Sequence, residues 1–201
     1  MLFRSGVDLS VNVGKKHGDF EWNVGLVGMY YTSKNTKWDE NVKYDWLKAE
    51  GEAIDALRGY QCIGFFKDAA DVESSAKVNA NTKPGDLKYV DQNNDGVINE
   101  QDQVVLGKWG ASWVMGLNLT AKYKGFTLFV AGTGSFGGKG LKNNSYMHVY
   151  GDRKYSEVVR GRWTEETADI ATYPRLTTQG GDLNFVASDR SEEHTSELQS
   201  H

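Results

Sequence analysis

The chain has 201 residues, of which 39% are hydrophobic and 12% aromatic, with 23 glycines and 2 prolines. Its formal net charge of −4 provides no basic surface, so we expect no nucleic-acid partner. The single cysteine, Cys62, excludes an internal disulfide and a cysteine-rich metal centre. No stretch reaches the roughly 18–20 consecutive apolar residues of a transmembrane helix, although the alternating strands of a membrane barrel would escape that criterion.

The first predicted elements are two strands joined by a short turn. Apolar and polar residues alternate over 7–15 and again over 20–32, and the turn is expected at Lys15–Asp19. This period of two predicts a β-hairpin with one apolar and one polar face. The apolar face would carry Val7, Leu9, Val11, Val13, Phe20, Trp22, Val24 and Leu26.

A long polar insert, residues 33–111, follows the first hairpin. Part of Trp38–Leu57 is expected to form a short helix. The segment Ala69–Asn81 consists of small and polar residues and is expected to be mobile. The insert also holds the motif with the most chemical information in the chain.

Residues 91–102 (DQNNDGVINEQD) have the spacing of a calcium-binding loop. Oxygen-bearing residues stand at loop positions 1, 3 and 5, glycine at position 6 permits the sharp bend, and a carboxylate stands at position 12. The predicted ligands for Ca²⁺ are the side chains of Asp91, Asn93, Asp95 and Asp102 and the carbonyl of Val97. Asp102 is shorter than the usual glutamate, so we expect weak binding, on the order of 10⁻⁴–10⁻³ M. The alternative is an Asx-rich turn that binds no metal.

A second hairpin repeats the pattern of the first. Strands are predicted at 112–123 and 126–134, with the turn at Lys124-Gly125. Arms of about 9–12 residues match a tilted strand that crosses a bilayer. Tyr123 and Phe126 lie beside the turn and Trp113 at the far end of its arm, as in the aromatic girdles of membrane barrels. A soluble sandwich would give the same alternation, but tight turns that alternate with very long connections favour a barrel.

Both tight turns are expected on one side of the sheet, because each joins an outbound arm to its return arm. The long connections 33–111 and 135–186 then lie on the other side. In outer-membrane barrels the short turns face the periplasm and the long loops face outward. The loop 91–102 is therefore expected to be extracellular.

The remaining motifs do not indicate an enzyme. Gly132–Gly137 fits G-x-G-x-x-G, but no helix or βαβ unit is evident after it, so we expect no dinucleotide site. The glycine-rich segment 136–142 is expected to be a flexible loop, and Ser156–Arg162 one helical turn. The credible histidines are His17 and His148, and the acids scatter without a context that would place two of them about 5–10 Å apart, so we expect no independent catalysis.

Both ends of the chain resemble translated sequencing adapters. Arg190–His201 is similar to one common adapter, and Met1–Ser5 is similar to the opposite one. Such segments are excluded from fold reasoning. We therefore expect residues 6–189 to be an internal piece of a longer protein.

Taken together, these stretches resemble the barrel of a SusC/RagA-type TonB-dependent outer-membrane transporter, in its C-terminal half. The most specific piece is residues 84–99 (PGDLKYVDQNNDGVIN), preceded by the aromatic and glycine-rich residues 59–66 (GYQCIGFF). Further similar pieces are Tyr123–Phe126, Arg162–Thr164, Tyr173–Leu176 and Ala187–Asp189. The sequence departs from the family at Glu100-Gln101 and in the insert Trp38–Leu57.

The resemblance implies an all-β fold: a fragment of a large antiparallel barrel of about 22 strands with a plugged lumen. It implies import of oligosaccharides, or of peptides, across the cell outer membrane, with a SusD-like lipoprotein over the extracellular face. TonB would act through a plug that these residues do not include, and outer-membrane lipid would surround the wall. Aromatic loop residues would contact substrate or partner, or would simply pack within the loops: Trp38, Trp46, Tyr146, Tyr150 and Trp163.

An alternative from another class is a secreted, soluble, calcium-binding β-sandwich such as a carbohydrate-binding module. It would share the alternating strands and the loop 91–102. The two differ in what covers the apolar face, which is lipid in the transporter and a second protein layer in the module.

Overall fold

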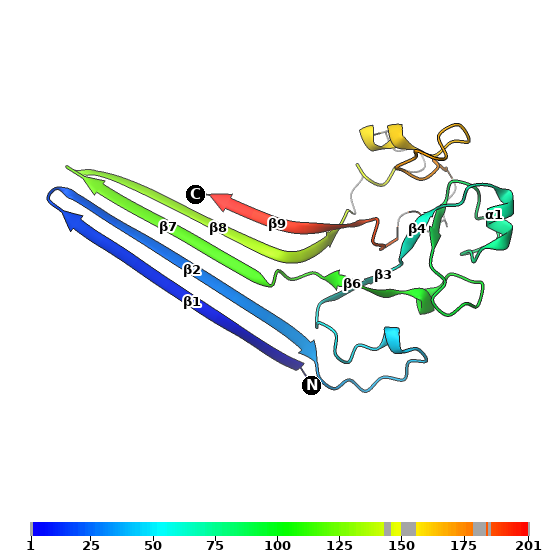
Figure 1. Cartoon of the computed structure of the whole chain (residues 1–201), viewed down its shortest axis with the longest axis horizontal. Coiled ribbons are helices and arrows are strands. Elements are labelled where there is room, and N and C mark those ends of the chain that lie inside the picture. Colours follow the sequence, from blue (N-terminus) through cyan, green and yellow to red (C-terminus); the bar gives the residue numbers. More distant parts are fainter. Residues whose placement is uncertain (1, 143–145, 150–155, 179–183, 185, 201) are drawn as a thin grey trace.

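The computed structural model describes residues 2–142, 146–149, 156–178, 184 and 186–200. An antiparallel sheet of five strands dominates it, in the order β1-β2-β7-β8-β9 (Figure 1). These strands are β1 (Leu2–His17), β2 (Phe20–Asn35), β7 (Trp113–Tyr123), β8 (Phe126–Leu141) and β9 (Glu192–Ser200). The sheet is open, with β1 and β9 at its edges. No helix in the described part of the chain is long and apolar enough to cross a membrane.

The register of the strands gathers the apolar residues on one face. Val11 pairs with Leu26, Leu26 with Leu117 and Leu117 with Gly132, and residues that pair directly share a face. This apolar face ends in two rows of aromatic residues. The turn-end row is Phe20, Trp22, Tyr123 and Phe126, and the loop-end row is Tyr30, Trp113 and Phe136.

The opposite, polar face is crowded where glycines meet larger neighbours. A Cβ on Gly116 would lie 2.7 Å from Val27 Cγ2, and a Cβ on Gly25 would collide with the amide of Asn118. Gly28, whose missing side chain would project from the apolar face, has open space around it. The two faces therefore differ in crowding as well as in polarity.

The two tight turns lie at the same end of the sheet, as expected (Figure 1). The first is shorter than predicted: β1 continues to His17 and only Gly18 and Asp19 form the turn. In the second, Lys124 and Gly125 have φ of 45° and 86°, which is the type I′ geometry that matches the twist of a hairpin. A non-glycine residue tolerates this conformation at Lys124 because the hairpin on both sides holds it.

The long insert is more ordered than predicted. It contains two small antiparallel pairs: β3 (Ala56–Gly59) with β6 (Val104–Lys108), and β4 (Cys62–Phe65) with β5 (Leu87–Tyr89). Helix α1 (Ala69–Ser74) lies inside the segment 69–81, for which no helix was predicted. The predicted helix in 38–57 is limited to one 3-10 turn, η1 (Asp45–Leu47). Two further 3-10 turns are η2 (Glu100–Asp102) and η3 (Glu157–Gly161), the second as predicted.

The glycine-rich segment 136–142 was expected to be a loop, and this is wrong for residues 136–141. They continue β8 to Leu141. After an irregularity between Ser135 and Gly138, Gly138–Leu141 pair with Glu192–Thr195 of β9, which belongs to the adapter-like segment 190–201. The motif Gly132–Gly137 accordingly lies within a strand and makes no phosphate-binding turn.

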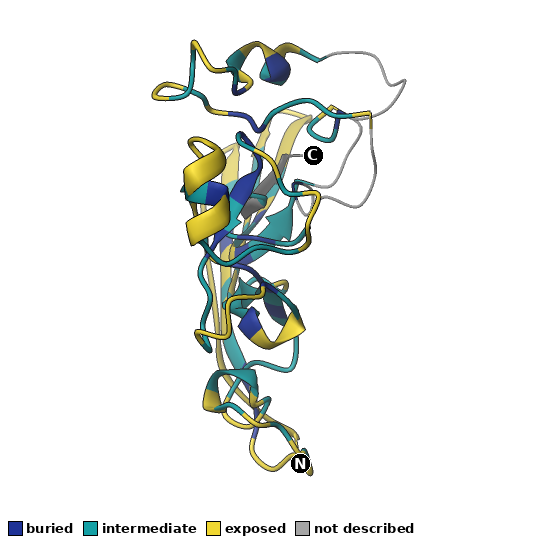
Figure 2. Ribbon diagram, turned by 90° about the vertical axis from the view of Figure 1, so that its right-hand side faces the viewer, coloured by how far each residue is buried: buried dark blue, intermediate teal, exposed yellow. Residues whose placement is uncertain are grey.

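Buried apolar residues gather among the loops and not on the sheet. One cluster contains Tyr60, Leu87, Tyr89 and Ile98, and another contains Val149, Val159 and Tyr173. Figure 2 views the loop half, where dark blue buried segments stand in front of mostly exposed strands. The loops therefore have small cores of their own at one end of the sheet.

Candidate functional site

A buried polar cluster joins the two long connections at the loop end of the sheet. Arg175 Nε lies 2.6 Å from Asp86 Oδ1, and Asn184 Nδ2 donates to the same oxygen at 2.9 Å. The amide of Leu87 donates to Asn184 Oδ1 at 2.8 Å. We call this cluster the Asp86–Arg175–Asn184 latch. Asp86 and Asn184 are 4% and 7% exposed and so are shielded from water, while the Arg175 side chain is half-buried.

The residue before the latch allows the two connections to approach closely. Gly85 has φ of 86°, and a Cβ there would lie 2.6 Å from Trp163 Cδ2. Its carbonyl accepts a hydrogen bond from the Arg175 amide at 2.9 Å. Trp163 is 9% exposed, so its ring packs on the backbone of Gly85. Packing within the loops thus accounts for Trp163, and little of its surface is available to a ligand.

A second set of contacts ties the same connections together through β4. Tyr60 donates its amide to Ala187 and accepts from the amide of Asp189, at 2.9 and 3.1 Å. Asp189 Oδ1 in turn accepts from the amide of Cys62 at 2.9 Å. Together with the latch, these bonds join the first and second connections into one folded unit, the rim cap (residues 36–112 with the described residues of 142–191).

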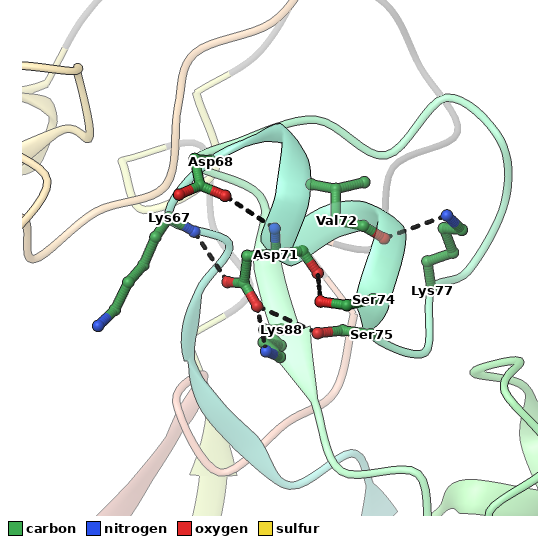
Figure 3. Close-up of polar contacts among 8 residues, drawn as sticks. All are labelled: Lys67, Asp68, Asp71, Val72, Ser74, Ser75, Lys77 and Lys88. Atoms are coloured by element: carbon green, nitrogen blue, oxygen red, sulfur yellow. Dashed lines mark hydrogen bonds and ion pairs between the residues drawn. The ribbon is translucent and has the colours of Figure 1, made fainter.

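Helix α1 is fixed to the rim cap by carboxylates (Figure 3). Asp68 is its N-cap, and its side chain accepts from the amide of Asp71 at 2.7 Å. Asp71 itself forms an ion pair with Lys88 Nζ at 2.6 Å and accepts from the Lys67 amide at 3.0 Å. The hydrogen bond from Lys88, followed by that from Lys67, lowers the pKa of the Asp71 carboxyl below its ordinary value of 3.8.

The loop 91–102 has the predicted bend and a dense set of local hydrogen bonds. Gly96 has φ of 82°, as expected at loop position 6. Asp91 accepts from the amides of Asp95 and Gly96 at 3.2 and 2.8 Å, and Asp95 accepts from the amide of Val97 at 2.9 Å. Asn93 Oδ1 also accepts from the Asp95 amide, at 3.0 Å. These bonds are those of an Asx-rich turn.

The residue at loop position 12 is turned into the protein. Asp102 is 0% exposed, and its two oxygens accept from the amides of Gln92 and Asn99, at 2.9 and 2.8 Å. The side chain of Asn99 in turn caps the start of η2, so Asn99 and Asp102 form a capping box. In the described residues no group of three or more His, Cys, Asp or Glu side chains lies close enough to hold a metal ion. The predicted ligand set also includes the Asn93 side chain and the Val97 carbonyl, and calcium binding stays a prediction.

The aromatic candidates differ in their surroundings. Trp46 stacks on Tyr44 with ring centroids 4.6 Å apart and donates its indole N–H to the carbonyl of Gln101 at 2.8 Å. It therefore fixes the segment 44–47 to loop 91–102. Trp38 and Tyr146 are each 51% exposed and present accessible rings. Tyr150 lies outside the described residues.

Sequence reasoning missed Asp86, Arg175 and Asn184. Asp86 and Arg175 lie within the stretches that resemble the transporter family, but nothing local in the sequence pairs residues 89 positions apart. Burial raises the pKa of the Cys62 thiol above its ordinary 9.0, so the thiol stays protonated at neutral pH and is a poor nucleophile.

Comparison with known proteins identifies two relatives, and both are TonB-dependent receptors. The chain matches no protein-family model. It is 31% identical to TonB-dependent receptor P26 of Formosa agariphila over 137 residues, which are 66% of this chain and 13% of that receptor. It is 29% identical to TonB-dependent receptor P3 of the same organism over 90 residues, which are 45% of this chain and 9% of that receptor. The chain thus spans only a small part of the curated relatives that it matches.

Solved structures share the fold over nearly the whole chain. The RagAB peptide importer in its open-open state superposes with a TM-score of 0.67 at 17% identity, and the match covers 98% of this chain and 21% of the other. A structure of the RagAB peptide transporter gives a TM-score of 0.69 at 16% identity, over 98% and 21% of the two chains. The expected all-β fold, a segment of a large antiparallel barrel, is confirmed, as is the family resemblance.

Proposed function

Because this chain belongs to the TonB-dependent receptors of the outer membrane, we propose that its sheet is barrel wall and its rim cap is extracellular. On this proposal the whole receptor imports an oligosaccharide or a peptide, driven through TonB. One observation carries the proposal: the apolar sheet face lies between two aromatic rows, with tight turns at one end and folded loops at the other.

The distance between the two aromatic rows supports the assignment of lipid to the apolar face. On β7, Trp113 and Tyr123 belong to opposite rows and are ten residue steps apart. At about 3.4 Å per residue this is roughly 34 Å along the strand. A tilt of about 35–45° reduces it to roughly 24–28 Å across the membrane, close to the ~25 Å apolar band of outer-membrane barrels.

The soluble calcium-binding sandwich is less well supported. Such a module needs a second layer over its apolar face. Leu9, Leu26 and Leu128 are 65%, 52% and 58% exposed, and no second layer covers them among the residues that the structure describes. We therefore prefer the barrel wall.

Partner and substrate contacts belong to the rim cap in this proposal. A SusD-like lipoprotein would close over it, as the resemblance to the SusC/RagA type implies. Trp38 and Tyr146 are the accessible aromatic rings that would stack on a sugar or contact a peptide. In a weak Ca²⁺ site in loop 91–102, Asp102 would bind through the lone pairs that its two backbone amide donors leave open.

Cysteine labelling of the full-length receptor on intact cells tests the orientation. In a Cys62→Ser background, Trp38→Cys places a thiol on the rim cap and Asp19→Cys places one in a tight turn. We expect a membrane-impermeant maleimide to label position 38 on intact cells, and to label position 19 only after lysis. Equal labelling of both positions on intact cells, or a receptor that dissolves without detergent, would refute the proposal.

A further inference from the structure

The charges on the apolar face of the sheet are all of one sign. Over β1, β2, β7 and β8, the residues that share this face include two lysines, Lys15 and Lys34, and no aspartate or glutamate. Lys15 pairs with Trp22 of the turn-end row. It is exposed, and no hydrogen bond or ion pair occupies its ammonium group among the described residues. A cation therefore lies on the apolar side at the level of the aromatic row.

A second cation reaches the same side from the other tight turn. Lys124 Nζ lies 5.5 Å from the ring centroid of Tyr123, and Tyr123 belongs to the turn-end row on the apolar face. Both side chains are exposed. The cation–π contact holds the ammonium group over an apolar-face ring, where it has room for a further anionic partner.

The acids at this end of the sheet lie elsewhere. Glu21 is on the polar face, where it forms an ion pair with Lys122 at 3.6 Å and pairs across the strands with Lys16. Asp19 is in the first turn. On the polar face Lys16 and Lys122 thus both have Glu21 beside them, while the lysine on the apolar face beside the aromatic row has no acid on its own face.

We propose that Lys15 and Lys124, with Trp22 and Tyr123, bind the phosphate of an anionic phospholipid headgroup in the leaflet next to the tight turns. This inference rests on the proposed function, because it takes the apolar face to be in contact with lipid. Lysine stems lie along apolar surface while their ammonium groups reach the headgroup level. Indole and phenol rings prefer the same depth, so each lysine with its neighbouring ring offers a place for a phosphate whose acyl chains lie on the sheet.

The neighbour of Lys15 provides a matched control. Lys16 carries the same charge one residue away, but it projects from the polar face opposite Glu21. Replacing Lys16 changes the net charge by as much as replacing Lys15, and leaves the lipid-side cations in place. This control therefore distinguishes a general effect of net charge on lipid binding from binding at a site on the apolar face.

Native mass spectrometry of the full-length receptor in detergent tests the site, with phosphatidylglycerol and phosphatidylcholine as probes. Each lysine near a charged headgroup contributes about a fivefold change in affinity, so Lys15→Ala with Lys124→Ala should weaken phosphatidylglycerol binding about thirtyfold. Lys16→Ala should change the affinity for phosphatidylglycerol by less than about twofold. Lys15→Arg with Lys124→Arg should restore binding, because the charge remains. Phosphatidylcholine should be insensitive to all of these changes.

Two results would overturn the site: equal losses in Lys16→Ala and in the double variant, or equal affinity for the two lipids in the unaltered receptor. Unchanged melting temperatures of the variants in detergent confirm that the fold is retained. A failure of the proposed function would be seen differently. A receptor that dissolves without detergent would refute the proposal that the sheet is the wall of a membrane barrel.

Discussion

Arg175 Nε lies 2.6 Å from Asp86 Oδ1 and joins two segments that are 89 residues apart in the chain. Asn184 completes the latch by donating to the same carboxylate oxygen. The sheet fixes where each connection leaves the wall, and the latch fixes how the two connections meet above it. The following predictions address the rim cap, starting with this pair.

Asp86→Ala should loosen the contact between the two connections. It leaves Arg175, with 20% of its side chain exposed, without its carboxylate. Breaking such a pair costs roughly 3 kcal/mol, the lower end of the range for fully buried pairs. Hydrogen exchange at the Leu87 amide, which donates to Asn184, should accelerate accordingly. Asp45→Ala is the control, because the Asp45–Lys48 pair is exposed and should leave exchange unchanged. Similar effects of the two variants would contradict a role for the latch.

Gly85→Ala should destabilise the rim cap more than the same change at Gly51. Both glycines have positive φ, 86° and 89°, so alanine adds a similar backbone strain of roughly 1–2 kcal/mol. A Cβ at Gly85 also meets the ring of Trp163, while Gly51 has open space around it. Tryptophan fluorescence during denaturant unfolding measures the difference. Equal stability of the two variants would show that the Gly85–Trp163 contact is not required.

Asp102→Ala and Asp95→Ala should separate folding of loop 91–102 from calcium binding. Asp102 is buried and accepts two amides, so its removal should cost roughly 2–3 kcal/mol with or without calcium. Asp95 is exposed, so its loss should mainly reduce metal affinity, by well over tenfold if the site forms. Terbium luminescence excited through Trp46, which is bonded to Gln101, reports occupancy. No luminescence at millimolar terbium in the full-length receptor would end the calcium hypothesis.

The attachment of α1 should weaken in acid. The folded-state pKa of Asp71 is lowered below 3.8 by Lys88 and the Lys67 amide. A lowered carboxyl pKa contributes stability that is present above pH 3.8 and is lost as the pH falls through the lower folded-state value. Hydrogen exchange of residues 67–75, corrected for the intrinsic rate, should show this loss. In Asp71→Asn the loss should disappear, and an unchanged profile in that variant would assign it to another group.

The sequence predicted the hairpins well because apolar and polar residues alternate strictly in them. Only one register of the strands then places all of the apolar side chains on the same face. The sequence underestimated β8, since Gly138 and Gly140 have no pattern of their own and pair with β9, which lies in the adapter-like segment 190–201. Local sequence patterns could not predict the latch, because Asp86, Arg175 and Asn184 come into contact only in the folded chain, where the strands position both connections. The bend at Gly96 was predictable from spacing alone, while the inward turn of Asp102 depends on its capping box with Asn99.

The glycines of the sheet also bear on the shape of the wall. Gly25 and Gly116 leave space for Asn118 and Val27 on the polar side, while Gly28 is uncrowded on the apolar side. Side chains converge on the inner side of a bend and diverge on the outer side. A methyl group at Gly25 or Gly116 would push these side chains apart on the polar side, and would oppose the bending toward that side that closure of the proposed barrel requires.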